Sequence, residues 1–354
     1  MKKVLLALVL SGFLVPATAA ILTVSNSPLG GAQFSNLDAA INAATAGDTL
    51  LIEGTNIGYG ISALSVFDKP LVFIGSGLNT AKAQHKQTIL TAVGPWYFEI
   101  PSSAAGSRFY GIVFNNYTQL VQPSTNNLHF ENCMFNSAFN FNGHATHGTT
   151  FINCIFNSDA GANMQLYSST SQITGTLFSN CIFDGYIDGG NNPYSSIFID
   201  HCIFLSPNSG FANLYYANIS NSIFVNAFPS GTFSSSFNNN ICRVAGTLPP
   251  ASGGNTGTNN LSATDPLFVS YTPAGWWDQY HSFGWNYQLQ ASSPGKGAGT
   301  DSTDIGVFGG TTAFSITGEA PNAPVVRSMN INNTIIPTNG TLNVSVQASK
   351  PRNN

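Results

Sequence analysis

A six-residue pattern recurs through the middle of the chain and decides its fold. The copies read FENCMF at 130–135, FINCIF at 151–156, FSNCIF at 178–183, IDHCIF at 199–204 and ISNSIF at 219–224, with an earlier variant, FYGIVF, at 109–114. At the fourth position of the pattern, successive copies are 21, 21, 27, 21 and 20 residues apart. A nearly fixed period of this length indicates a solenoid, in which each repeat forms one coil and packs on its neighbours.

Each copy of the pattern predicts two short strands joined by a one-residue corner. Leu128 and Phe130 alternate with polar residues, which is the period of a strand with one buried face. The third position is usually asparagine, as in Asn132, and asparagine tolerates the left-handed backbone conformation that a sharp corner needs. Beyond the corner, Cys133 and the phenylalanine that ends the pattern are expected to point inward, with Met134 pointing outward. A third, less regular strand follows, so the coils predict three parallel sheets.

The asparagine corner and the stacked Phe and Cys columns resemble the coils of the pectin-lyase-like superfamily. The resemblance covers most of the chain after residue 20. It implies an all-β fold, a right-handed parallel β-helix with coils of about 21 residues. That superfamily includes lyases, hydrolases, adhesins and proteins with no known activity, so the resemblance does not identify one function.

The chain divides into four predicted parts. They are a signal peptide at 1–20, an N-terminal cap with the first strands at 21–60, the β-helix with its closing segment at 61–310, and a small C-terminal β extension with a tail at 311–354. The signal peptide is predicted from Lys2 and Lys3, the apolar run that follows them, and an Ala-x-Ala cleavage signal ending at Ala19. We therefore expect a bacterial protein that is exported to the periplasm, the cell surface or the medium, with no transmembrane segment after cleavage.

The two ends of the solenoid need covers, because an open end exposes unpaired strand edges and apolar interior. At the N-terminal end, a helix is predicted with Ser35 as its N-cap and Asp38 as the partner in a capping box. Near the other end, residues 238–242 are expected to form the last coil and 247–260 a loop. The closing segment is expected to fold over the C-terminal end.

The composition favours some partners and disfavours others. Charged residues make up 7% of the chain, against about a quarter in ordinary domains, and the net charge is −4. Nucleic acid is therefore not an expected partner. Apart from histidine, the only basic residues between Ser107 and Ala291 are Arg108 and Arg243. Cleavage of an anionic polymer normally uses cations to bind its carboxylates, so a pectate-type enzyme is disfavoured and a neutral polysaccharide or cell-surface glycan is the expected ligand.

The five cysteines have two interpretations. They are Cys133, Cys154, Cys181, Cys202 and Cys242. Export would permit disulfides, and adjacent coils would bring cysteines within bridging range. However, the column also contains Ile112 and Ser222, which favours small buried residues with free thiols.

Catalytic candidates occur in the loops and turns of the middle coils. They are His144, His147, Asp159, Asp184, Asp188 and Arg243. Carboxylates on successive coils could form an acid–base pair or hold Ca²⁺, the one cofactor that the sequence suggests. The alternative, which we favour, is that Asp159 and Asp188 shape turns and that the histidines are solvated. No metal site is predicted. The Asn-Thr-Asp, Asp-Asp and Arg-Ile-Lys strings expected of a polygalacturonase-like hydrolase are absent.

An aromatic segment offers candidate ligand-binding residues, namely Trp276, Trp277, Tyr280 and Trp285. Aromatic rings of this kind stack on flat ligands such as sugars, and their polar tips form hydrogen bonds. The alternative is a plug over the C-terminal end of the core.

Three classes of function remain open from the sequence. The first is a non-catalytic protein that binds an extracellular polysaccharide, the second a polysaccharide lyase or glycoside hydrolase with unusual catalytic groups, and the third a surface adhesin or structural solenoid. The scarcity of basic residues favours the first. The oligomeric state is not predicted.

Overall fold

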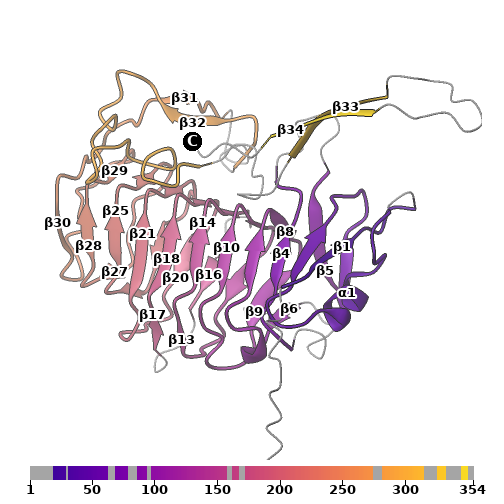
Figure 1. Ribbon diagram of the computed structural model, residues 1–354. Helices are drawn as coiled ribbons and strands as arrows, with labels where there is room; N and C mark the ends of the chain where they lie inside the picture. Colours follow the sequence, from indigo (N-terminus) through magenta and orange to yellow (C-terminus); the bar gives the residue numbers. More distant parts are fainter. Residues whose placement is uncertain are drawn as a thin grey trace, which may run out of the picture.

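Three parallel sheets form a β-helix in the computed structural model (Figure 1). The described residues are 19–28, 31–62, 68–78, 86–93, 97–157, 162–166, 172–273, 281–314, 325–331 and 344–349. The pattern positions of neighbouring coils pair directly, so Phe130 lies between Phe109 and Phe151. The fold is the predicted right-handed parallel β-helix with coils of about 21 residues.

The three sheets are named here A, B and C. Sheet A contains β1 (Ile21–Val24), β2 (Thr49–Ile52), β4 (Val72–Ile74), β7 (Arg108–Tyr110), β10 (His129–Glu131), β14 (Thr150–Ile152), β18 (Thr176–Ser179), β21 (Ile197–Asp200), β25 (Asn218–Ser220), β28 (Ser236–Asn238) and β30 (Thr256–Thr258). Sheet B contains β3 (Tyr59–Ser62), β5 (Thr88–Val93), β8 (Ile112–Phe114), β11 (Met134–Phe135), β15 (Ile155–Phe156), β19 (Ile182–Phe183), β22 (Ile203–Phe204), β26 (Ile223–Phe224) and β29 (Ile241–Cys242). Sheet C contains β6 (Tyr97–Ile100), β9 (Tyr117–Leu120), β12 (Phe139–Asn140), β16 (Ala162–Gln165), β20 (Tyr186–Asp188) and β23 (Phe211–Ala212).

Smaller elements complete the described chain. They are the helix α1 (Leu37–Ala43), the 3-10 turn η1 (Ser102–Ala104), the parallel pairs β13 (Thr146–His147) with β17 (Ile173–Thr174) and β24 (Leu214–Tyr215) with β27 (Thr232–Phe233), and the antiparallel pairs β31 (Phe268–Ser270) with β32 (Asn286–Leu289) and β33 (Val325–Ile331) with β34 (Val344–Ser349).

The corner prediction is confirmed by the backbone. The φ angles at the third pattern position lie in the left-handed region in every copy: Gly111 64°, Asn132 51°, Asn153 53°, Asn180 54°, His201 52° and Asn221 53°. Asparagine reaches this conformation at low cost because its short polar side chain makes local hydrogen bonds. The corner separates each strand of sheet A from the next strand of sheet B.

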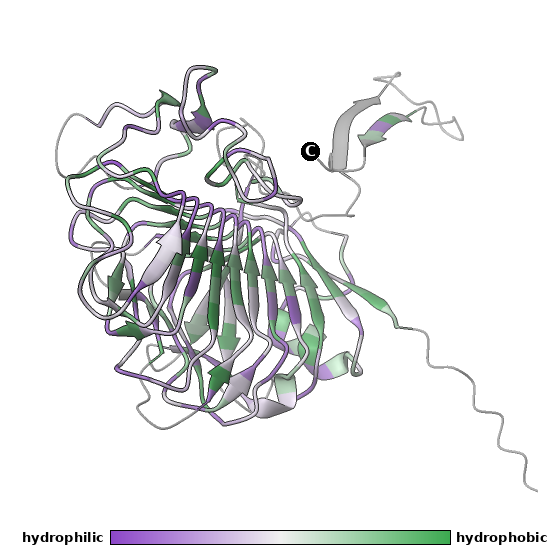
Figure 2. Cartoon of the chain, turned by 90° about the vertical axis from the view of Figure 1, so that its left-hand side faces the viewer, coloured by the Kyte–Doolittle hydropathy of each residue, from purple (hydrophilic) through white to green (hydrophobic). Residues whose placement is uncertain are grey.

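Phenylalanine rings form two stacks inside the solenoid. The rings of Phe156 and Phe183 are 4.6 Å apart with an interplanar angle of 3°, and those of Phe183 and Phe204 are 4.8 Å apart. Such spacings follow from the distance between parallel strands, so each ring contacts its copies above and below. In Figure 2 the hydrophobic stretches of successive coils line up with one another.

The cysteines are buried and free, as the column argument favoured. Burial raises the pKa of Cys133, Cys154 and Cys181 well above the ordinary value and that of Cys242 to about 11. Their thiols therefore behave as small apolar groups in the core.

The N-terminal cover is helix α1, which buries Leu37, Ala40 and Ile41 against the core. Two details of its prediction are wrong. The N-cap is Asn36, whose side-chain oxygen accepts a hydrogen bond from the backbone N–H of Ala39, and Ser35 precedes it. Asp38 accepts hydrogen bonds from Ser62 of β3 and so ties the helix to the first coils.

The end of the solenoid also differs from the prediction. Strand β30 lies within 247–260, which was expected to be a loop, and it pairs with β28 as a further strand of sheet A. Its corner, Asn259, has a φ of 58°. Gly257, the central residue of β30, pairs with Phe237 at the inward position where other coils carry a large apolar residue. The sequence of this strand therefore lacks the apolar alternation that would have identified it.

The largest correction concerns the closing segment. It does not simply close the C-terminal end: the closing segment, here the described residues from Asp265 to Phe314 with β31 and β32, lies along the side of the solenoid, over sheet B (Figure 1). Met134 does point outward, but it is 8% exposed because this outer face of sheet B is covered. The outward row and its cover form a second apolar cluster of Leu78, Val113, Met134, Ile155, Ile182, Ile203, Leu205, Ile223, Val225, Ile241, Phe268, Tyr271, Tyr287, Leu289, Ile305, Val307 and Phe314.

Candidate functional site

Four of the predicted site residues lie outside the described residues: Asp159, Trp276, Trp277 and Tyr280. The interpretation of the aromatic segment as a plug or a binding site therefore stays a prediction for three of its four members. The fourth, Trp285, packs partly buried on the cluster over sheet B, with its ring edge-on to Tyr271 at 5.5 Å. It helps to hold the closing segment on the side of the solenoid.

The two histidine candidates are not joined to the aspartates by any contact among the described residues. His144 is half-buried in the turn after β12, and His147 is exposed at the end of β13. The Nδ1 atom of His147 lies 3.0 Å from the hydroxyl of Thr174 on the paired strand. This arrangement agrees with surface histidines that stabilise a loop.

Asp188 and Asp184 have different roles. Asp188 accepts a hydrogen bond of 2.9 Å from the backbone N–H of Gly190, which is the turn-forming role that the sequence favoured. Asp184 is fully buried, and its Oδ1 accepts a hydrogen bond of 2.6 Å from the backbone N–H of His281. Burial lowers the pKa of His281 to about 4, so the ring is neutral at pH 7. The buried carboxylate of Asp184 therefore binds the closing segment shortly before β32.

Arg243 also holds the closing segment. Its Nη2 donates to Asn226 Oδ1 at 2.7 Å, and Asn226 in turn donates to the hydroxyl of Tyr271 at 2.9 Å. The guanidinium carbon lies 5.8 Å from the centre of the Tyr271 ring, within range of a cation–π interaction. Two catalytic candidates, Asp184 and Arg243, thus anchor the same segment from the solenoid side.

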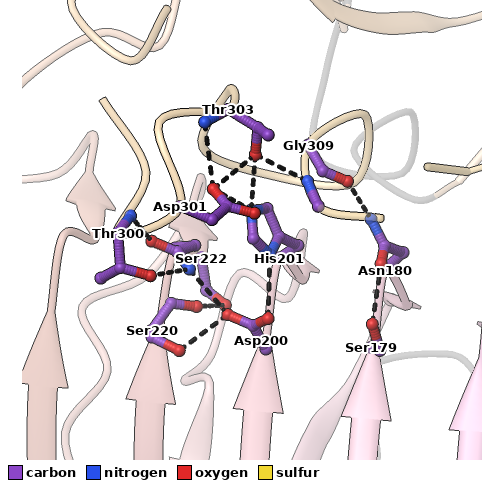
Figure 3. Close-up of polar contacts among 12 residues, drawn as sticks. Ser179, Asn180, Asp200, His201, Ser220, Ser222, Thr300, Asp301, Thr303 and Gly309 are labelled. Atoms are coloured by element: carbon purple, nitrogen blue, oxygen red, sulfur yellow. Dashed lines mark hydrogen bonds and ion pairs between the residues drawn. The ribbon is translucent and has the colours of Figure 1, made fainter. Parts of the chain in front are cut away.

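Four successive corners bind the last part of the closing segment, residues 295–314, which we call the strap. Asn239 donates to the carbonyl of Ala298, Asn221 exchanges hydrogen bonds with Thr300, His201 contacts Thr303, and Asn180 donates to the carbonyls of Val307 and Gly309 at 2.9 and 2.8 Å. The strap therefore runs along the corner column against the direction of coil stacking (Figure 3). The asparagines serve two purposes, since they turn the chain and bind the strap.

His201 lies at the centre of this contact (Figure 3). Its Nδ1 is 3.0 Å from Asp200 Oδ2, and its Nε2 is 3.2 Å from the Thr303 hydroxyl and 3.7 Å from Asp301 Oδ1. An acid, a histidine and a hydroxyl in this order resemble a hydrolytic triad. However, the His201 side chain is 2% exposed, and the Thr303 hydroxyl already donates to Asp301 and accepts from the backbone N–H of Gly310. The array therefore binds the strap and has no free nucleophile.

The carboxylates around His201 have lowered pKa values. Burial alone would raise the pKa of Asp200, but hydrogen bonds and the charge of His201, with further bonds from Ser220 and Asn221, bring it below the ordinary value. For Asp301, burial alone would likewise raise the pKa, but hydrogen bonds from Thr303 and the charge of His201 together outweigh it, and the pKa is lowered. A lowered folded-state pKa contributes stability above the unfolded-state pKa of about 4, and that stability is lost as the pH falls through the folded value.

We expect the variant His201→Asn to be less stable than the wild type at about pH 6, and the difference in the free energy of unfolding to shrink toward about pH 2. Asparagine is the usual corner residue, so the backbone is preserved while the histidine contact that lowers both carboxylate pKa values is lost. Urea unfolding followed by circular dichroism between about pH 2 and pH 6 measures the difference. The matched control is His147→Asn at an exposed position, which should leave the dependence of the unfolding free energy on pH unchanged. An unchanged dependence in His201→Asn would contradict the assignment.

Exposed aromatic side chains that the sequence interpretation missed lie on the outer face of sheet A and in the turns beside it. Phe198, Tyr194 and Tyr216 are 44%, 54% and 54% exposed. Tyr216 has a φ of 53°, a costly conformation for an aromatic residue, and Tyr215 beside it stacks on Phe233 at 4.7 Å. Phe198 lies on the outer face of β21 and pairs with Asn218, and Tyr216 stands at the corner two residues before Asn218. We call Tyr194, Phe198, Tyr215, Tyr216 and Phe233 the aromatic platform.

A column of side chains connects the aromatic platform with earlier coils. It contains, in register, Arg108, His129, Thr150, Leu177, Phe198, Asn218, Ser236 and Thr256. Each of the first six stands immediately before a copy of the six-residue pattern. Aligning the repeats one residue further toward the N-terminus would have revealed this surface row.

Comparisons with known proteins found a distant structural likeness and no matching sequence. No protein-family model and no curated protein matches this chain. A solved structure described as the pectate lyase Pel9A is similar over 82% of this chain and 96% of its own, with 16% sequence identity and a TM-score of 0.46. A likeness this distant concerns the arrangement of the backbone alone.

Two further observations apply to the described residues only. No helix among them is long and apolar enough to cross a membrane. No three histidine, cysteine, aspartate or glutamate side chains in that part of the chain come together as metal ligands. The suggestion of Ca²⁺ stays a prediction, because Asp159 lies outside the described part.

Proposed function

We propose that this protein is exported and binds a neutral extracellular polysaccharide on the outer face of sheet A. The observation that carries this proposal is the aromatic platform. Exposed Phe198 on β21, with Tyr194 and Tyr216 in the turns before β21 and β25, offers ring faces for sugars along the edge of sheet A. Sugar rings present apolar C–H faces, and aromatic side chains bury those faces while hydroxyl tips form hydrogen bonds.

The neighbourhood of the aromatic platform supports an uncharged ligand. From Leu177 through Phe198 and Asn218 to Ser236 and Thr256, the outer column contains no charged side chain. Amide and hydroxyl groups match the hydroxyls of a neutral sugar, whereas a polymer of uronates needs cations to balance its carboxylates. Binding of a neutral polysaccharide is thus favoured over cleavage of a uronate polymer.

Affinity electrophoresis of the full chain through gels that contain a glucan, a mannan, an arabinan or polygalacturonate tests the proposal. We expect at least one neutral polymer to retard the protein, and polygalacturonate not to. Phe198→Ala should weaken the retardation about tenfold, which corresponds to roughly 1.4 kcal/mol. The affinity should change little between about 0.05 and 0.5 M salt, because salt screens charges and not ring stacking.

The matched control is Tyr97→Ala, which removes a ring that is 41% exposed on sheet C, away from the aromatic platform. It should leave retardation unchanged. Free migration in all neutral polymers, or equal losses in both variants, would contradict the proposal.

A further inference from the structure

A second array of hydroxyl, histidine and acid lies in the same outer column, two coils before Phe198. The Nδ1 atom of His129 is 2.8 Å from the Thr150 hydroxyl, and its Nε2 is 3.1 Å from Glu131 Oε2. Glu131 shares strand β10 with His129, and Thr150 is the register partner of His129 on β14. The coil period therefore places the three groups side by side.

The hydrogen bonds define the direction of proton transfer. A carboxylate only accepts, so Nε2–H donates to Glu131 and Nδ1 is left as the acceptor. The Thr150 hydroxyl then donates to Nδ1. A hydroxyl bound to a neutral imidazole, which a carboxylate orients, is the arrangement that activates an oxygen nucleophile.

The contrast with His201 shows why this array is able to react. At His201 the hydroxyl is occupied by two further partners and the ring is closed off by the strap. The His129 and Glu131 side chains are instead 22% and 19% exposed, and Thr150 is half-buried on a face with no described strap residue over it. Among the described residues, the Thr150 hydroxyl contacts only His129.

A cation stands beside the array. Arg108 precedes His129 in the column and is exposed, and Tyr110 on the same strand has its ring centre 5.3 Å from that of His129. The positive charge of Arg108, one strand from His129 and two from Thr150, favours negative charge that develops on an oxygen over this column.

We propose that Thr150, His129 and Glu131 hydrolyse acyl esters carried by the bound polysaccharide, a proposal whose substrate rests on the proposed function. Thr150 Oγ attacks the ester carbonyl and passes its proton to His129 Nδ1. The bond from the acyl carbon to the sugar oxygen breaks, and the imidazolium protonates that oxygen. Water, activated by the same imidazole, then hydrolyses the acyl-threonine ester, which releases a carboxylic acid and restores the hydroxyl. Glu131 is a positioning residue that holds the ring.

The placement of the array suits the aromatic platform. Two strand spacings, about 10 Å, separate Thr150 from Phe198 along the column. A sugar chain that stacks on Phe198 and follows the solenoid axis passes over Thr150, where a small acyl substituent such as acetyl would meet the hydroxyl.

Hydrolysis of p-nitrophenyl acetate by the full chain tests the chemistry without a glycan. We expect Thr150→Val and His129→Gln each to lower kcat/KM at least about 100-fold, while Thr150→Ser keeps the activity because it keeps a hydroxyl. Glu131→Gln should lower kcat and leave KM nearly unchanged. Thr258→Val makes the same change at an exposed position of β30 and should have no effect. Circular dichroism confirms that each variant is folded.

A fluorophosphonate provides a second measurement, since it should add one mass label, located on Thr150 by peptide mass spectrometry. Wild-type rates in Thr150→Val, or a label elsewhere, would overturn the inference. Gel retardation of Thr150→Val separates the two proposals, because the variant should still bind the neutral polymer through Phe198. If the wild type binds the polymer but has no esterase activity, only the catalytic proposal is contradicted. If it has esterase activity but binds no neutral polymer, only the polysaccharide-binding proposal is contradicted.

Discussion

Replacing Asn180 with valine is expected to lower the free energy of unfolding by at least about 3 kcal/mol. A β-branched residue at a φ of 54° is strained by about 1–3 kcal/mol. In addition, the strap carbonyls of Val307 and Gly309 lose their donor in a buried place, at about 1–3 kcal/mol each. The backbone strain and the lost hydrogen bonds both lower stability, because Asn180 both turns the corner and binds the strap. Urea unfolding of wild type and variant measures the difference.

Two further variants separate the effects at Asn180. Asn180→Gly tolerates the left-handed conformation, so it should show the loss of the strap hydrogen bonds with little backbone strain. Asn153→Val carries the strain at a corner for which no strap hydrogen bond is found among the described residues, and it should be destabilised less than Asn180→Val. If Asn180→Val unfolds at the wild-type urea concentration, Asn180 is not a strained corner that binds the strap.

Phe183→Ala is expected to lower the free energy of unfolding by about 3–5 kcal/mol. The Phe183 ring is fully buried between Phe156 and Phe204 and edge-on to Phe178 at 5.5 Å. Removing it leaves a cavity in a stack whose spacing is set by the strands, so the neighbouring rings cannot close the space without distorting the ladder.

The thermal midpoint of Phe183→Ala should fall clearly below that of Phe183→Leu, which fills most of the space and should cost less than about 1.5 kcal/mol. Tyr97→Ala supplies the exposed reference. A midpoint for Phe183→Ala that equals that of Tyr97→Ala would show that the stack adds little to stability.

The two arrays of acid, histidine and hydroxyl illustrate how burial separates structure from chemistry. His201 and His129 have similar neighbours and distances, yet the strap seals one and leaves the other open. The same residue types therefore stabilise the fold at one place and are available for catalysis at another. Burial of the ring and the number of partners of each hydroxyl, Thr303 and Thr150, distinguish the two.

The six-residue pattern by itself determined the β-helix, its corners and its core. Period, inward alternation and the left-handed tolerance of asparagine are local properties, so Asn132, Cys133 and Phe135 could be placed without knowledge of distant contacts. The helix of the N-terminal cap was also predictable, with an error of one residue at its N-cap. Among the catalytic candidates, the turn role of Asp188 was predictable for the same local reason.

Only the tertiary structure decided where the closing segment goes and which faces stay open. The outward isoleucines, such as Ile182, looked like surface positions, because nothing in the repeat shows that Val307 and its neighbours return to cover them. For that reason Asp184 and Arg243 were interpreted as catalytic candidates when they anchor a distant segment. The aromatic platform and the His129 array were missed because they form between coils, across about 20 residues of sequence. Contacts between coils depend on register, and register becomes visible when stacked strands pair in three dimensions.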